Sequence, residues 1–181
     1  MKIVGGFFEK DVTMELLHLI DDKLTMPYEV IVCGTTALHV QGYDYRRTTD
    51  VDFAKPLSSM LWAVIDRVLK ENPNLNSRVY DDQAAGVLCF LEDFEDRLVE
   101  IEDNFKQLKV YAMSVEDWIV TQLEAKKFDS VLKYPQQLTR ERLQFIEDNM
   151  HLYCGLKEDY ARQSLKILWE KLDEVESAGT K

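Results

Sequence analysis

Two aspartates stand one residue apart in the segment TDVDFA, where Asp50 precedes Val51 and Asp52 precedes Phe53. Successive side chains of a β-strand point to opposite faces of a sheet, so a strand here places both carboxylates on one face. Burying such a pair without a cation, an arginine or solvent is costly. Hard divalent cations such as Mg²⁺ prefer oxygen ligands and often use one or two carboxylates together with substrate phosphates. The pair therefore suggests a metal site, although most Asp-x-Asp pairs are solvated residues on the outer face of a strand.

A third carboxylate could come from the segment RLVEIE, residues 97–102, which places Glu100 and Glu102 on one face of another strand. Glu100 has an apolar neighbour on each side, so we expect it to be the inner ligand and Glu102 to be more exposed. Two metal ions about 4 Å apart could then activate an attacking hydroxyl and stabilise a leaving pyrophosphate. We therefore predict that the catalytic, metal-binding residues are Asp50, Asp52 and Glu100.

The elements around the aspartate pair can be predicted from hydrophobic patterning and turn residues. The segment YEVIVC indicates a buried strand, TTALHVQ a short helix that ends at Gly42, and TDVDFA a second strand. An amphipathic helix starting at Asp11 precedes them, and a helix capped by Ser58 or Ser59 follows. Four further strand candidates share short apolar or alternating runs, and lie at residues 77–81, 86–91, 97–102 and 108–113. The acidic turn EDFED is expected to join the second and third of these as an antiparallel hairpin.

From Ser114 onward the pattern is helical. Ser114 stands three residues before Asp117, which is typical of a capped helix start. Two more helices are predicted in LTRERLQFIEDNMHLY and KEDYARQSLKILWEKLDEVE. A mixed sheet followed by a run of helices indicates the α+β class. We expect an α/β core over residues 1–113 and a C-terminal helical part over residues 114–181 that packs on the core.

Composition excludes several classes of function. The chain has 22 Lys and Arg against 33 Asp and Glu, a net charge of -11, which argues against a broad nucleic-acid-binding surface. No segment approaches the roughly 20 apolar residues of a membrane helix, and the N-terminal segment does not resemble a signal peptide. Three cysteines in apolar contexts indicate reduced, buried thiols. We therefore expect a soluble, cytoplasmic protein with no membrane partner. The three histidines lack the spacing of metal ligands and are expected to fill core or surface positions.

The order strand, glycine, short helix and R-x-T-x-D-x-D resembles the nucleotidyltransferase superfamily that includes DNA polymerase beta. Within it, the sequence is most similar to the branch of AbiEii-type toxins and minimal nucleotidyltransferase antitoxins. The later segment VYAMSVEDWIVTQLEAKKFD is also similar, so the resemblance spans about residues 28–130. The matching motif positions are Gly34, Ala37, Leu38, Gly42, Arg46, Thr48, Asp50, Asp52 and Phe53.

The resemblance implies a nucleotidyltransferase-like mixed sheet flanked by helices, and transfer of a nucleoside monophosphate from a nucleoside triphosphate to an acceptor hydroxyl. It implies Mg²⁺ or Mn²⁺ as the cofactor. Gly34 would let the backbone approach the triphosphate, Thr35 would offer its hydroxyl, and the start of the next helix would face the phosphates. Arg46 would pair with phosphate or hold an aspartate in place. The residues assigned to nucleotide binding are Gly34, Thr35, Arg46, Thr48 and Lys126.

The acceptor is left open by the resemblance: it could be a protein, a tRNA or a small molecule, in a toxin–antitoxin or defence system. The negative net charge makes tRNA the least compatible of these, because phosphate contacts supply most nucleic-acid affinity. A toxin or antitoxin protein is a candidate partner.

The sequence departs from the family pattern at three positions. Thr35 stands where a second glycine or a serine is usual, Gln122 where a lysine is usual, and Glu100 where an aspartate is usual. Lys126 and Lys127 lie one turn after Gln122 and could replace the missing cation. These departures leave an alternative open, in which the protein is a catalytically degenerate nucleotidyltransferase-fold protein that acts as a binding or regulatory partner.

Overall fold

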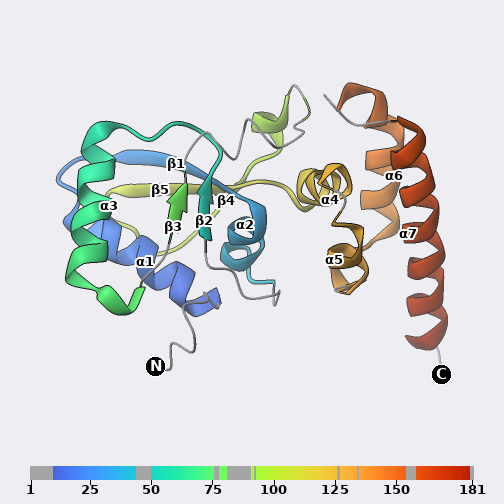
Figure 1. Ribbon diagram of the computed structural model, residues 1–181, viewed down its shortest axis with the longest axis horizontal. Coiled ribbons are helices and arrows are strands. Elements are labelled where there is room, and N and C mark those ends of the chain that lie inside the picture. The colour runs from blue at the N-terminus through green and yellow to red at the C-terminus, as the bar shows by residue number, and fades with distance from the viewer. Residues whose placement is uncertain are drawn as a thin grey trace. The chain divides into compact units, whose positions relative to one another are not determined.

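The computed structural model describes the chain in eight ranges: residues 10–43, 50–75, 78–80, 91, 93–125, 127–133, 135–153 and 158–179. The chain divides into two compact units, one within residues 1–87 and 98–113, the other within 88–97 and 114–181 (Figure 1). One division falls after residue 113, and the described residues 91 and 93–97 belong with the helical unit. Within the described ranges, no helix is both long enough and apolar enough to cross a membrane.

The described part of the first unit contains a mixed sheet of five strands in the order β3-β2-β1-β5-β4. The central strand β1 (Tyr28–Cys33) is parallel to β5 (Leu108–Ala112) and antiparallel to β2 (Asp50–Phe53). At the two edges, β3 (Arg78–Tyr80) is parallel to β2, and β4 (Val99–Glu100) is antiparallel to β5. The predicted mixed sheet is thus confirmed.

The strand predictions hold best at the centre of the sheet. The segments around β1, β2 and β5 form strands close to the expected bounds, and β4 is shorter than expected. The predicted strand at residues 77–81 is described at residues 78–80 only, and these form β3. The predicted hairpin of residues 86–91 with 97–102 cannot be followed, because residues 86–90 lie outside the described ranges. The observed partner of β4 is β5, with Glu100 opposite Tyr111 in the ladder.

Three helices complete the described first unit: α1 (Lys10–Lys23), α2 (Gly34–Val40) and α3 (Ser59–Glu71). All three were predicted, and Ser58 caps α3 by accepting a hydrogen bond from the Leu61 N–H at 3.2 Å. The helices α1 and α2 both contact β5, and α2 also contacts β1 and β2. We infer that these helices pack on the apolar face of the sheet. The buried strand residues of that face are Val30, Val32, Val51, Phe53, Leu108, Val110 and Ala112.

A buried aspartate fixes the turn that leads into β5. Asp21, near the end of α1, is 2% exposed and accepts backbone N–H groups from Lys106 at 2.9 Å and from Gln107 and Leu108 at 2.7 Å. Burial alone would raise the pKa of Asp21, but the three N–H donors outweigh it, so the pKa lies below its ordinary value. The carboxylate therefore holds the turn in its ionised form.

The described part of the second unit is helical. Its helices are α4 (Val115–Glu124), α5 (Phe128–Leu132), α6 (Arg140–Asn149) and α7 (Glu158–Gly179). Single 3₁₀ turns occur at Phe94–Arg97, Pro135–Gln137 and Met150–Leu152 in this unit, and at Pro73–Leu75 in the first. The predicted capping by Ser114 is confirmed, because its hydroxyl accepts the Asp117 N–H at 3.1 Å. The short helix α5 was not predicted.

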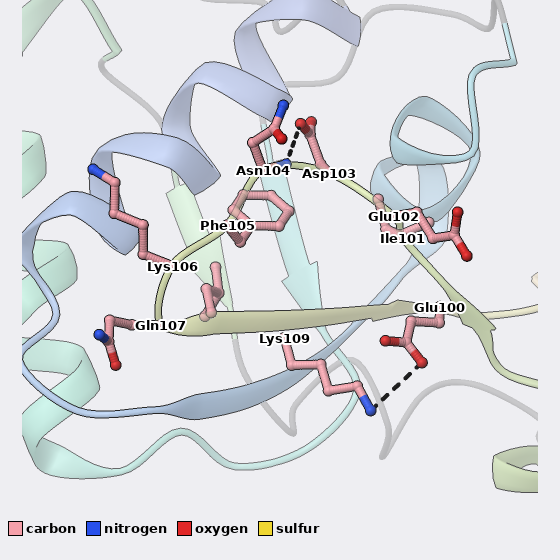
Figure 2. Close-up of a pocket in the computed structure, with 10 residues that line it drawn as sticks. Glu100, Ile101, Glu102, Asp103, Asn104, Phe105, Lys106, Gln107 and Lys109 are labelled. Carbon is pink, nitrogen blue, oxygen red and sulfur yellow. Dashed lines mark hydrogen bonds and ion pairs between the residues drawn. The ribbon is translucent and has the colours of Figure 1, made fainter.

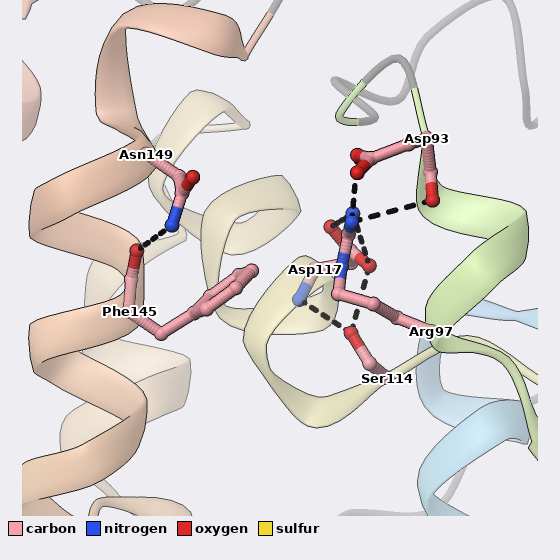
Figure 3. Close-up of polar contacts among 6 residues, drawn as sticks. All are labelled: Asp93, Arg97, Ser114, Asp117, Phe145 and Asn149. Atoms are coloured by element: carbon pink, nitrogen blue, oxygen red, sulfur yellow. Dashed lines mark hydrogen bonds and ion pairs between the residues drawn. The ribbon is translucent and has the colours of Figure 1, made fainter.

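A buried ion pair joins the 3₁₀ turn at Phe94–Arg97 to the start of α4. Arg97 donates from Nη2 to both carboxylate oxygens of Asp117, at 3.1 and 3.3 Å, and from Nη1 to Asp93 at 2.7 Å (Figure 3). The Ser114 hydroxyl donates to Asp117 Oδ2 at 2.7 Å. The guanidinium also lies 5.4 Å from the ring centre of Phe145. Asp117 is fully buried, so this network brings residues 93–97 into the helical unit.

Candidate functional site

The aspartate pair lies on β2 with the expected alternation. Val51 and Phe53 are buried, at 0% and 1% exposure, whereas Asp50 and Asp52 are each half-buried. Both carboxylates therefore project from one face of the sheet, and both apolar side chains enter the core on the other. In the antiparallel ladder Asp52 lies opposite Cys33, the last residue of β1. The pair is thus placed beside the point where β1 ends and α2 begins.

The first residue of α2 makes close contact with this pair. Gly34 has a φ of +60°, a conformation that favours glycine, and a Cβ added there would lie 2.8 Å from Asp52 Oδ2. The Asp52 carboxylate therefore occupies the space that any other side chain at position 34 would need. The structure thus brings Gly34 and Asp52, two of the motif positions, into close proximity.

Cys33 lies between the strand end and the aspartates but is not a candidate nucleophile. It is 0% exposed, and burial, with a smaller contribution from the negative charge of Asp52, raises the pKa of its thiol well above the ordinary value. A thiol held neutral in this way is unreactive. Cys33 is therefore a buried, unreactive neighbour of Asp52 on the adjacent strand.

The two threonines after Gly34 face the protein. Thr35 is 7% exposed, which leaves little of its surface for a phosphate, and α2 is only seven residues long. Thr36 is fully buried, and its hydroxyl donates to the backbone oxygen of Asp50 at 3.4 Å. That link between α2 and β2 was not anticipated from the sequence, because a buried threonine in a helix gives no signal of its distant partner.

Glu100 is not brought to the aspartate pair. The strand pairings run from β2 through β1 and β5 to β4, where Glu100 lies opposite Tyr111. This register places the carboxylates of Asp52 and Glu100 on the same face of the sheet. However, β1 and β5 lie between β2 and β4, so three strand spacings, about 14 Å in total, separate Glu100 from Asp52. Carboxylates that share a metal ion must each lie within about 2.5 Å of it. The expected trio of Asp50, Asp52 and Glu100 is therefore not assembled.

Glu100 has a different environment. Its side chain is 54% exposed and lies 3.5 Å from Lys109 Nζ on the neighbouring strand β5 (Figure 2). It lines an open cavity of about 630 Å³ along the connection between β4 and β5, together with the alternative ligand Glu102. Within the described ranges, no three His, Cys, Asp or Glu residues are grouped closely enough to hold a metal ion. The described candidate for metal binding is thus the Asp50–Asp52 pair.

Three of the predicted nucleotide-binding residues, Arg46, Thr48 and Lys126, lie outside the described residues, so their roles remain predictions. Gln122, which stands where the resemblance expects a lysine, belongs to α4 in the second unit. It is 7% exposed, and its Oε1 atom has no hydrogen-bond partner among the described residues. Lys127, one of the two lysines that could replace the missing cation, is exposed.

Comparison with known families decides the broad class. The model of a family described as a nucleotidyltransferase of unknown function (DUF6036) matches residues 7–175 of this 181-residue chain. The chain belongs to this family. The match covers the described residues of both units up to α7, so the nucleotidyltransferase family includes the helical unit as well as the sheet. No protein of curated function and no solved structure matches the chain.

The donor set of the aspartate pair on β2 suits a hard cation. Two carboxylates on one strand face, half-buried beside a glycine, supply oxygen ligands from a rigid element. Mg²⁺ commonly takes one or two protein carboxylates and completes its octahedral shell with water and substrate phosphates. The pair on β2 therefore fits a metal ion that arrives with a nucleotide, and fits an all-protein metal cage poorly.

Proposed function

We propose that this protein transfers a nucleoside monophosphate from a nucleoside triphosphate to an acceptor hydroxyl, with Asp50 and Asp52 holding Mg²⁺ or Mn²⁺. The observation that supports the proposal is the placement of both carboxylates on one half-buried face of β2, against Gly34, in a chain of the nucleotidyltransferase family. If the two aspartates were solvated and purely structural, neither carboxylate would require the residue beside it to lack a side chain.

In this reaction the acceptor oxygen attacks the α-phosphorus, a new P–O bond forms, and the bond to the β-phosphate oxygen breaks to release pyrophosphate. A metal ion held by Asp50 and Asp52 would supply positive charge that neutralises the phosphates and stabilises the leaving group. The contribution of Asp50 and Asp52 is to fix the position of that charge relative to the sheet, because positioning and charge neutralisation supply most of the catalysis in phosphoryl transfer. The proposed partner is therefore a metal-bound nucleoside triphosphate.

The Gly34–Phe53 segment resembles AbiEii-type toxins and minimal nucleotidyltransferase antitoxins. On this basis we extend the proposal to the acceptor and to the biological setting. The resemblance favours a protein acceptor, or a protein partner, in a toxin–antitoxin pair in the cytoplasm. The net charge of -11 disfavours tRNA, since no compensating basic surface is expected from the composition.

A second candidate is a catalytically degenerate family member that binds a partner without transferring nucleotide. Three observations favour it: Glu100 lies about 14 Å from Asp52 by strand spacing, Thr35 is buried, and Gln122 stands in place of a lysine. Two carboxylates remain sufficient to bind a metal–nucleotide complex in this candidate, but the acceptor would not be activated.

Label transfer separates the two candidates. The protein is incubated with each α-labelled nucleoside triphosphate and Mg²⁺ or Mn²⁺, with and without cell extract, beside the Asp50→Ala, Asp52→Ala and Glu100→Ala variants. Transfer that is lost in both aspartate variants and kept in Glu100→Ala supports the enzyme. Metal-dependent nucleotide binding without transfer supports the degenerate protein, and absence of both contradicts the proposed site.

A further inference from the structure

We infer that Gly34 is a positioning residue for Asp52: it directs this carboxylate toward the metal by leaving space for it, and its role does not depend on contact with the triphosphate. The inference rests on the proposed function for the identity of the metal. The close approach of Gly34 to Asp52 Oδ2 is independent of that function.

The atoms nearest to a Cβ added at position 34 belong to one side chain. The three atoms nearest to an added Cβ are Oδ2, Cγ and Cβ of Asp52, at 2.8, 3.7 and 3.9 Å. Ordinary contacts of a side-chain carbon begin at about 3.5 Å. Any residue other than glycine at position 34 would therefore have to push the Asp52 carboxylate away, and no backbone group stands among the nearest atoms to share the displacement.

The backbone of Asp52 cannot move to absorb this collision. β2 is held between β1 and β3, with Asp52 opposite Cys33 on one side and opposite Tyr80 on the other. Cys33, the residue of β1 opposite Asp52, is fully buried, so this strand pair is closely packed. The collision would be relieved by rotation of the Asp52 side chain, which moves its oxygens away from the face shared with Asp50.

A small displacement is enough to matter. Metal–oxygen distances tolerate a deviation of only about 0.2 Å, and residues that orient a metal ligand typically change metal affinity by about 10- to 100-fold when replaced. Asp50 would keep its position, because none of its atoms is among those nearest to position 34. The predicted defect is therefore specific to Asp52 and to the metal.

The matched variants are Gly34→Ala and Gly42→Ala. Gly42 also has a positive φ, of 88°, but it is exposed at the end of α2, so its replacement reproduces the backbone strain without the Asp52 collision. If Gly34→Ala fails to fold, Gly34→Asn replaces it, because asparagine tolerates positive φ better and still carries a Cβ.

Two readouts are measured on the full chain. Carboxylate ¹³C NMR compares the chemical shifts of Asp50 and Asp52 at one fixed pH without metal or nucleotide, and electron paramagnetic resonance of free Mn²⁺ measures metal binding without nucleotide. We expect the Gly34 variant to change the chemical shift of the Asp52 carboxylate, leave that of Asp50 unchanged, and weaken Mn²⁺ binding about tenfold or more, while Gly42→Ala behaves as wild type in both.

An unchanged chemical shift of the Asp52 carboxylate and unchanged Mn²⁺ binding in the folded Gly34 variant would overturn the inference, and so would equal defects in the Gly42 variant. Failure of the wild-type protein to bind Mn²⁺, both alone and together with a nucleoside triphosphate, would instead contradict the proposed function. In that outcome the chemical shift of the Asp52 carboxylate still decides whether Gly34 positions Asp52.

Discussion

The two units use carboxylates in opposite ways. Asp117 in the second unit is fully buried and receives hydrogen bonds from Arg97 and Ser114. Asp50 and Asp52 in the first unit are half-buried on a strand face, and Asp52 lies against a glycine. Asp117 is buried among donors of its own unit and is assigned a stabilising role, whereas the carboxylates on β2 are partly exposed and can be reached by an external cation. The depth of burial thus separates the structural acid from the candidate functional pair.

The largest predicted effect is on the stability of the second unit. Asp117→Ala should reduce the free energy of unfolding by about 3 kcal/mol, because it leaves the partly buried Arg97 charge without its buried partner. Asp93→Ala, which removes an exposed partner of the same arginine, should change stability far less. Urea denaturation followed by circular dichroism measures both variants. Similar losses in the two variants would mean that the buried pair is no more important than the exposed one.

Asp21→Asn tests a structural carboxylate inside the first unit and should cost about 2 kcal/mol, because a charged acceptor of three backbone N–H groups becomes a neutral one. The pKa of Asp21 is lowered in the folded protein, so its stabilising contribution is complete above the unfolded pKa of about 3.9 and is lost as pH falls through the folded value. The stability difference between wild type and Asp21→Asn should therefore be constant near neutral pH and shrink below about pH 4. Urea denaturation across this pH range measures the difference, and a constant gap would contradict the assignment.

Asp52→Asn should have a smaller effect on folding, about 1 kcal/mol or less, because the side chain is half-buried and the variant keeps its size. The same holds for Asp50→Asn. Thermal unfolding without ligand measures both variants. If either variant lost as much stability as Asp117→Ala, the β2 aspartates would be structural carboxylates like Asp117. The contrast between the two units would then not hold.

Glu100→Gln should give the smallest effect. Its side chain is exposed and its pairing with Lys109 is on the surface, so neither stability nor metal–nucleotide binding should change measurably. Titration of Mn²⁺ and nucleotide into this variant checks the expectation. A binding defect equal to that of Asp52→Asn would restore Glu100 to the site and contradict the strand order.

Sequence patterns that are local could be predicted, and contacts that depend on sheet order could not. The alternation of Asp50 to Phe53 places the side chains of one strand, and the Ser114 cap lies within four residues of its partner, so both were predicted correctly. Glu100 alternates in the same way, but alternation does not reveal that two other strands separate β4 from β2. The prediction therefore placed the third ligand, Glu100, on the correct face of the sheet, but Glu100 lies too far from Asp52 to share a metal ion with it.

The structural carboxylates escaped prediction for a related reason. Asp21 is 85 residues from Lys106, and Arg97 is 20 residues from Asp117, so no short motif links either pair. The glycine at position 34 was predicted to matter through the motif, but its contact with Asp52 depends on the pairing of β1 with β2. The motif identified position 34 as important, but only the pairing of β1 with β2 shows that Asp52 is its neighbour.

The most direct test of the central claim is the thermal shift caused by a metal–nucleotide complex. A ligand that binds only the folded state at 100 times its dissociation constant stabilises it by about 2.7 kcal/mol. The account predicts that Mg²⁺ with a nucleoside triphosphate raises the melting temperature of the wild-type protein and of Glu100→Gln, that EDTA abolishes the rise, and that Asp50→Asn and Asp52→Asn lack it while melting normally without ligand. A full rise in Asp52→Asn would contradict the assignment of the β2 aspartates as the metal–nucleotide site.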